Sequence, residues 1–170
     1  MIVQIRVDDR LIHGQVAMVW TKELNAPLIV VANDEAAKNE VMKMTLKMAT
    51  PSGKKLLIRS VEEAIEVFND SRGKDKRIFV LTNSVSDANK IAQNVQDIEA
   101  VNVANVGRFD KSDKKTQVLL CPSVQLNPQE LEATRELADL TRVDSYNQVL
   151  PSNARLSLTK LLTELDKGEK

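Results

Sequence analysis

The residues best suited to chemistry lie close together near the start of the chain, from Asp8 to Gly14. These seven positions hold two acids, an arginine, a glycine and the only histidine of the sequence. A neutral imidazole is a competent nucleophile or general base, and a guanidinium suits phosphate oxygens. The free N–H groups at the start of the helix expected from Gly14 onward favour an anion. The segment therefore predicts a phosphoryl group that is carried on, or contacted by, His13.

Each residue of this segment has a candidate role. His13 is the predicted phosphoryl acceptor, and Arg10 would bind the phosphate oxygens. Asp8 and Asp9 would orient Arg10, fix the imidazole tautomer or cap the loop by local hydrogen bonds. Gly14 would let backbone amides approach a ligand closely, because it has no Cβ. On residue types and spacing alone, a structural, hydrogen-bonding histidine is the more frequent alternative.

Three residues outside the segment have candidate roles as well. Arg6 either helps to hold the phosphate from the same strand end or forms a surface ion pair with an acid. Ser84 follows a buried strand and would either donate to a phosphate or cap the next helix. Arg108 lies in a polar loop at 107–116 and is the loop arginine best suited to an acidic partner or a phosphate.

Two expected elements position the histidine. Apolar and polar residues alternate over 2–7, which predicts a strand with one partly polar face. Residues 16, 19, 20 and 24 share one face of the following helix, so Trp20 is predicted to lie in the core. Ligands of an open α/β sheet collect outside the carboxyl ends of its strands, which is where His13 is expected.

The rest of the chain alternates between strand-like and helix-like segments. This alternation predicts an α/β fold of three layers (α/β/α), with helices on both faces of a mostly parallel, open twisted sheet of six to seven strands. One domain is expected over residues 1–170. A single helix is expected after Asp34, with Val41, Met44 and Met48 packed as core filler. The further strands are expected at 27–32, 55–59, 77–81, 100–103, 118–120 and 143–150, and the further helices at 61–68, 85–95, from 128, and from 158 to a frayed end beyond 166.

Composition excludes several classes of function. The 24 basic and 24 acidic residues balance, which argues against broad binding to nucleic acid. One histidine and one cysteine make a conventional zinc site very unfavourable, and we expect neither a metal nor a cofactor. Cys121 is expected to be a small buried residue of a strand. No apolar run approaches the ~20 residues that span a bilayer, and the N-terminus lacks a signal-peptide pattern, so a cytoplasmic protein is expected.

The segment Arg6–Val16 resembles the N-terminal signature of IIB components of the mannose/fructose/sorbose-type bacterial phosphotransferase system (PTS). Weaker matches follow in the right order, and the resemblance covers nearly the whole chain. Many members have a Gly-Gly pair after the fifth strand, where this chain reads Ala104 to Phe109, so the role of that loop stays open. The weaker matches are Trp20 and residues 32–34, 48–51, 101–103 and 149–151.

The resemblance implies a phosphocarrier, a protein-N(pi)-phosphohistidine–sugar phosphotransferase. The histidine matching His13 would accept a phosphoryl group from a phosphohistidine of the IIA component. It would then pass the group to a sugar that enters through the membrane components IIC and IID. Asp8, Asp9, Arg10 and Gln15 match the surrounding motif and would support the transfer.

The resemblance also implies a location. The chain would associate peripherally with the membrane permease complex, without direct insertion into the bilayer. The sugar, the oligomeric state and the phosphorylated nitrogen of His13 are not encoded in the signature. A small-molecule enzyme or a nucleotide-binding module that uses His13 as general acid or base is the alternative.

Overall fold

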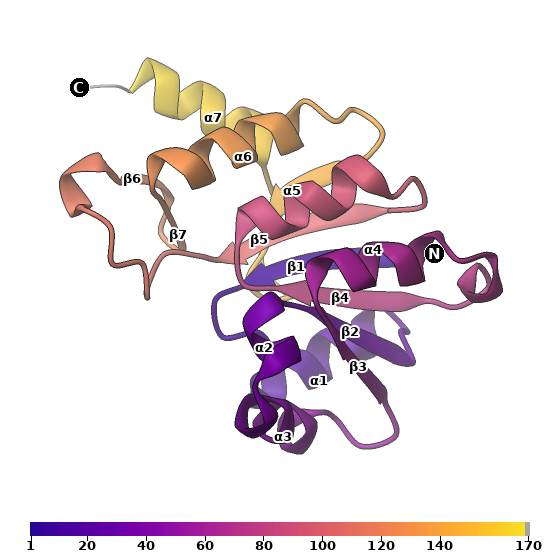
Figure 1. The fold of residues 1–170 in the computed structure, drawn as a ribbon. Helices are drawn as coiled ribbons and strands as arrows, with labels where there is room; N and C mark the ends of the chain where they lie inside the picture. Colours follow the sequence, from indigo (N-terminus) through magenta and orange to yellow (C-terminus); the bar gives the residue numbers. More distant parts are fainter. Residues whose placement is uncertain (169–170) are drawn as a thin grey trace.

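A seven-stranded, mostly parallel sheet runs through the computed structural model, which describes residues 1–168 (Figure 1). The strand order is β3-β2-β4-β1-β5-β8-β9, and of these neighbours β8 and β9 pair antiparallel. The predicted fold class is confirmed. The strands are β1 (Ile2–Asp8), β2 (Leu28–Ala32), β3 (Lys55–Arg59), β4 (Ile78–Thr82), β5 (Ala100–Asn105), β8 (Asp144–Asn147) and β9 (Leu156–Ser157).

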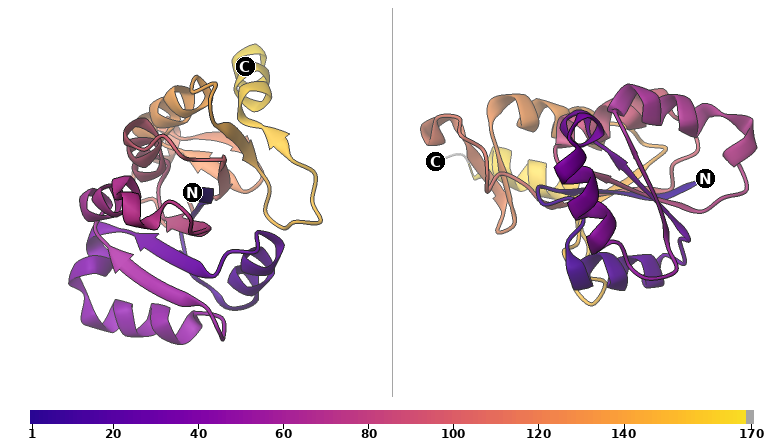
Figure 2. Two further views of the ribbon diagram at one scale, coloured as in Figure 1. Left: turned by 90° about the vertical axis from the view of Figure 1, so that its right-hand side faces the viewer. Right: turned by 60° about the horizontal axis from the view of Figure 1, so that its bottom comes forward.

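Helices cover both faces of the sheet (Figure 2). Buried residues of the first three helices form one core with one face, and the last four helices form the other core. Alternate strand residues point to opposite layers: Ile29 packs on the first layer and Val30 on the second. The helices are α1 (Gly14–Glu23), α2 (Asp34–Lys38), α3 (Glu40–Ala49), α4 (Val61–Asn69), α5 (Val85–Asn94), α6 (Pro128–Ala138) and α7 (Leu158–Lys167), with short 3-10 turns at Ser71–Gly73 and Lys114–Thr116.

Strand β1 is central in the sheet, and this position buries its polar residues as well as its apolar ones. It pairs in parallel with both β4 and β5, and all seven of its residues are buried. The polar residues expected on one face of this strand are present, but they lie inside the protein, because both sides of the strand are covered. Gln4 is buried and donates to the Tyr146 hydroxyl at 3.0 Å, and Arg6 lies inside the protein as well.

The segment expected to form one helix after Asp34 forms two. Asn39 leaves the helical conformation, with φ −113° and ψ 107°, and its side chain accepts from the Met42 N–H to start α3. This break turns α3 so that Leu46 faces the core and Met44 faces outward. The prediction that the apolar face of this segment is core filler is wrong, since Val41, Met44 and Met48 are exposed by 76%, 65% and 82%.

Other local predictions are confirmed or changed in detail. Trp20 and Cys121 are buried, as expected. The strand expected at 118–120 lies outside the main sheet, in an antiparallel hairpin of β6 (Val118–Cys121) and β7 (Val124–Leu126). The strand expected at 143–150 ends at Asn147. Helix α7 continues to Lys167, and the last part of the expected frayed end lies outside the described residues.

The parallel strands set the place of the site. Since β1, β4 and β5 run in the same direction, the loops after Asp8, Thr82 and Asn105 meet at one edge of the sheet. Within residues 1–168, none of the helices has the length and apolar character needed to cross a bilayer.

Helix α3 offers a matched pair of substitutions that tests its orientation. Replacing buried Leu46 by alanine removes core contacts and is expected to lower the free energy of unfolding by about 2–5 kcal/mol. Replacing exposed Met44 by alanine is expected to change it by less than about 0.5 kcal/mol. Urea unfolding of both variants measures the difference, and equal losses would contradict the orientation described here.

Candidate functional site

The first part of the loop between β1 and α1 is held by backbone hydrogen bonds. Leu11 donates its N–H to the Asp8 carbonyl at 2.8 Å, and Asp9 donates its N–H to the Asn105 carbonyl at 3.0 Å. Leu11 adopts a positive φ of 58°, which is unfavourable for a residue with a Cβ. Burial of Leu11 and Ile12 offsets that cost, because both side chains anchor in the core below the loop. The loop therefore presents His13 from a fixed base.

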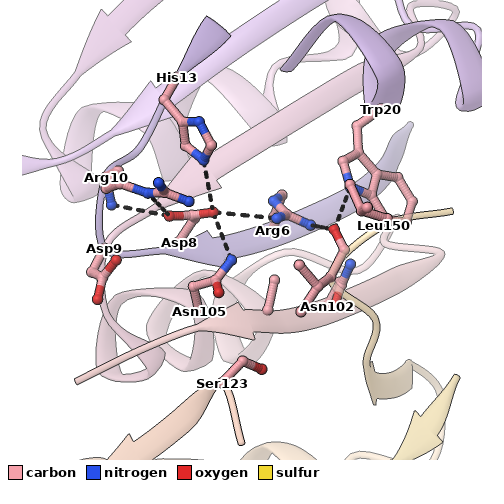
Figure 3. A network of polar contacts seen from close by, with 12 residues as sticks. Arg6, Asp8, Asp9, Arg10, His13, Trp20, Asn102, Asn105, Ser123 and Leu150 are labelled. Carbon is pink, nitrogen blue, oxygen red and sulfur yellow. Dashed lines mark hydrogen bonds and ion pairs between the residues drawn. The ribbon is translucent and has the colours of Figure 1, made fainter. Parts of the chain in front are cut away.

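The carboxylate of Asp8 is the centre of the polar network at this edge (Figure 3). It has no exposed surface, and it lies at the end of β1. Cations and N–H donors surround it, which a buried carboxylate requires. Its contacts are Arg6 Nη2 at 3.2 Å, the backbone N–H of Arg10 at 3.1 Å, Asn105 Nδ2 at 3.1 Å, Arg10 Nε at 3.7 Å, Arg108 Nη2 at 3.9 Å and His13 Nε2 at 3.9 Å.

The two ring nitrogens of His13 have different surroundings. Nε2 is buried, has no hydrogen-bond partner and faces Asp8 Oδ2 at 3.9 Å, which is beyond hydrogen-bond length but within electrostatic range. The side chain as a whole is 29% exposed. Figure 3 shows one ring nitrogen directed at Asp8 and the other directed away from it. Nε2 is therefore closed to an approaching group, and Nδ1 is the ring nitrogen on the side away from Asp8.

The surroundings of His13 favour its neutral form. Burial lowers the pKa of the imidazole, and the positive charge of Arg10 lowers it further. Asp8 acts in the opposite direction, and Arg6 and Arg108 each add to the lowering. Since the ordinary value is 6.5, the ring is largely neutral at pH 7 and keeps a lone pair for nucleophilic attack.

The first turn of α1 lies directly behind the histidine. His13 is the N-cap residue, but its side chain makes no capping hydrogen bond, and no acid lies in the first turn. Gly14 has a φ of +40°, and a Cβ built on it would meet nothing within 4 Å. The helix start thus has no side-chain cap from His13 and no acid, and the positive end of the helix dipole there favours an anion.

A second loop closes on the first one. Arg108 follows β5, donates its backbone N–H to Asp9 Oδ2 at 3.2 Å and pairs with Asp9 Oδ1 at 2.8 Å. This pairing raises the pKa of the Arg108 guanidinium. The loop turns at Gly107, with φ +101°, where a Cβ would overlap the Gln125 carbonyl. Arg108 therefore belongs to the site, and the sequence contained no signal that it would pair with Asp9.

Of the other residues predicted for the site, one is exposed on α1, one caps α5 and one is buried in β1. Gln15 is exposed in the first turn of α1. Ser84 caps α5, and Glu130 of α6 accepts from the N–H groups of Val85 and Ser86, so this helix start is already occupied. The expected exposure of Arg6 at the strand end is wrong, because the closed layers around β1 leave it 1% exposed.

Sequence reasoning missed Asn105. Its side chain donates to Asp8 and its carbonyl accepts from Asp9, so it joins the two loops. The available signal was a polar residue at the carboxyl end of a strand that neighbours β1. Across residues 1–168, no group of three or more histidine, cysteine, aspartate or glutamate residues is arranged to hold a metal.

The family model for the PTS system sorbose subfamily IIB component matches residues 2–169. The chain belongs to this family. IIB components are phosphotransferases of sugar transport, so this class of activity is assigned with the family.

Individual relatives agree with the family. A probable phosphotransferase enzyme IIB component of Streptococcus pyogenes serotype M6 is 67% identical over 162 residues, which are 95% of this chain and 99% of the relative. The mannose-specific EIIAB component of Escherichia coli K12 is 31% identical over 95% of this chain and 48% of its own length. The crystal structure of the IIBSor domain of the sorbose permease from Klebsiella pneumoniae superposes with a TM-score of 0.86 at 30% identity, over 96% of this chain and 97% of that one.

The charges around His13 predict its titration. Because burial and Arg10 lower the pKa, the midpoint is expected below 6.5, and Arg10→Gln should raise it by removing one cation. The unfolded chain binds this proton more readily, so this contribution to stability is lost as the pH falls below 6.5. Ring NMR of the single histidine measures the midpoint without assignment. A midpoint above 6.5 in the wild type, or a drop in Arg10→Gln, would contradict this description.

Proposed function

We propose that His13 is the phosphoryl acceptor of this IIB component. It receives the group from a phosphohistidine of a IIA component and passes it to a sugar entering through the membrane components IIC and IID. The observation that carries this proposal is the orientation of the ring, whose Nε2 is buried against Asp8 while Nδ1 points away from Asp8. Nδ1 is therefore the nitrogen that becomes phosphorylated.

Asp8 suits the chemistry of the transfer. A buried carboxylate opposite Nε2 favours the tautomer with the proton on Nε2, which leaves the lone pair on Nδ1. That lone pair attacks phosphorus while the phosphorus–nitrogen bond of the donor breaks, and the bonding pair returns to the donor imidazole. The His13 proton stays on Nε2, where Asp8 stabilises the positive charge that develops on the ring. At the second partner a sugar hydroxyl oxygen attacks phosphorus while the bond from phosphorus to His13 Nδ1 breaks, the bonding pair returns to the imidazole, and the hydroxyl proton is released.

Arg10 and the start of α1 suit the incoming phosphoryl group. Phosphoryl transfer depends mainly on positioning and on stabilising charge, and a phosphorylated side chain carries about −1.5 to −2 charges. The Arg10 side chain is 38% exposed, and its Nε lies 3.7 Å from Asp8 Oδ1. Its guanidinium, together with the uncapped start of α1, would bind the phosphoryl oxygens. Asp9 and Arg108 hold the two loops together around this place.

The wider role follows from the family. We place the chain in the cytoplasm, as a single IIB domain over residues 1–170, in peripheral contact with the permease complex. The EIIAB name of the Escherichia coli relative, of which this chain matches 48%, supports a IIA partner as donor. The sugar is one of those handled by mannose/fructose/sorbose-type systems. A partly exposed histidine that serves two partners in turn requires transient interfaces.

The acceptor assignment is tested by phosphorylation. Wild-type protein incubated with a phosphorylated IIA donor is expected to form one acid-labile, base-stable adduct on Nδ1, visible by phosphorus NMR. His13→Ala should form none, because it removes the only imidazole of the chain. Circular dichroism checks that this variant keeps its fold. Full labelling of His13→Ala, an Nε2 adduct, or turnover of a small molecule without any partner protein would contradict the proposal.

The role of Arg10 is tested against an arginine at the opposite end of the sheet. Arg10→Lys should slow phosphoryl acceptance about 10- to 100-fold, because loss of a charge-assisted hydrogen bond costs about 1.5–3 kcal/mol. Arg72 precedes β4, far from the loops after β1 and β5, and Arg72→Lys should leave the rate unchanged. Rapid-quench transfer from the donor measures both. Equal rates for the two variants would remove Arg10 from the mechanism.

A further inference from the structure

Arg6 is a buried cation with a specific set of partners (Figure 3). Its Nη2 donates to Asp8 Oδ2 at 3.2 Å, and its Nη1 donates to the carbonyls of Val149 at 3.1 Å and Gln148 at 3.4 Å. The guanidinium also lies 5.4 Å from the centre of the Trp20 ring. Trp20 donates its own Nε1 to the same Val149 carbonyl at 3.0 Å. The guanidinium is thus held on three sides.

This arrangement excludes a direct role for Arg6 at the phosphoryl group. The side chain is 2% exposed, so it does not reach an incoming partner. It does reach Asp8 Oδ2, and this is the same oxygen that faces His13 Nε2 at 3.9 Å. The position of that oxygen therefore depends on Arg6.

We propose that Arg6 is a positioning residue, which aims Asp8 Oδ2 at His13 Nε2 and so keeps Nδ1 unprotonated for phosphoryl acceptance. This inference rests on the function proposed above, and it adds the contact that holds Arg6, and through it Asp8, in place next to His13. The anchor is the Val149 carbonyl in the segment after β8, joined to Arg6 and Trp20. Residues near the C-terminus thus set the tautomer of a histidine near the N-terminus.

Two physical features support a positional role over a purely structural one. A buried guanidinium loses hydration, and burial lowers the pKa of Arg6 against the opposing effect of Asp8. An apolar residue would fill this space without that cost. Arg6 and Asn105 Nδ2 both donate to Oδ2 of the Asp8 carboxylate. The backbone N–H of Arg10 donates to Oδ1. The carboxylate plane is therefore fixed at both oxygens.

The test reads the tautomer of His13 directly. The chain has one histidine, so nitrogen-15 ring NMR gives one pair of signals, recorded well above its midpoint. The wild type is expected in the Nε2–H form. Arg6→Met should give a mixture of tautomers and slow phosphoryl acceptance about 100-fold, as misplacement by about 1 Å does in enzymes. Arg6→Lys should fall between the two, because an ammonium reaches fewer of the partners.

A matched control lies on the same strand. Gln4 is fully buried on β1 and donates to Tyr146, away from the Asp8 carboxylate. Gln4 also accepts a long hydrogen bond from Asn102 at 3.5 Å, and neither of these two partners is the Asp8 carboxylate. Gln4→Met should therefore disturb the core and keep the wild-type tautomer and rate. A structural role for Arg6 predicts that both methionine variants lose stability alike and that neither changes the tautomer.

Each outcome decides the inference. A wild-type tautomer and rate in folded Arg6→Met overturns it, and so does an even mixture of tautomers in the wild type. If Arg6→Met does not fold, Arg6→Lys decides in the same way, because it retains a positive charge beside Asp8. The charged groups that act on His13 are Asp8, Arg6, Arg10 and Arg108. The NMR readout needs no donor protein, so a wild type that fails to accept a phosphoryl group refutes the proposed function separately.

Discussion

The contacts at the edge of the sheet that holds His13 depend on the burial of one carboxylate, that of Asp8. Asp8 lies at the end of the central strand without exposed surface, and a lone carboxylate in such a place would take up a proton rather than stay charged. The surrounding arginines and Asn105 satisfy it, and they come from β1, from the loop after it and from the end of β5. Removal of any of these partners leaves part of the charge uncompensated. The loops of the site are therefore held in place by the ion pairs and hydrogen bonds of Asp8 as well as by apolar packing.

Much of this protein could be predicted from sequence because its signals are local. Capping residues such as Ser60 and Asn127 begin helices where expected, and the order of apolar runs gave the layered fold. The motif around His13 indicated the chemistry and the family. The surroundings of Arg6 were not predictable, because alternation along β1 gives the same pattern for a central strand and for an edge strand. Only the long-range pairing with β4 and β5 decides that both faces are covered.

The exposed face of α3 also could not be predicted from a local sequence pattern. Val41, Met44 and Met48 have helical spacing, and an uninterrupted helix from Asp34 would have buried them. A single residue in an extended conformation, Asn39, changes the rotation of the whole following helix. Likewise, the ion pair between Asp9 and Arg108 joins residues 99 positions apart, and nothing in the local sequence of either indicates the other.

The long-range anchoring of the histidine has a consequence for how the protein becomes active during synthesis. His13 leaves the ribosome early, but Asp8 meets Asn105 only after β5 is made, 97 residues later. Arg6 meets Val149 a further stretch along, at a separation of 143 residues. Contacts of such high sequence separation form late in folding. A nascent or truncated chain that lacks the end of the sequence would carry the complete signature around its histidine and still lack the contacts that anchor Arg6 and Asp8.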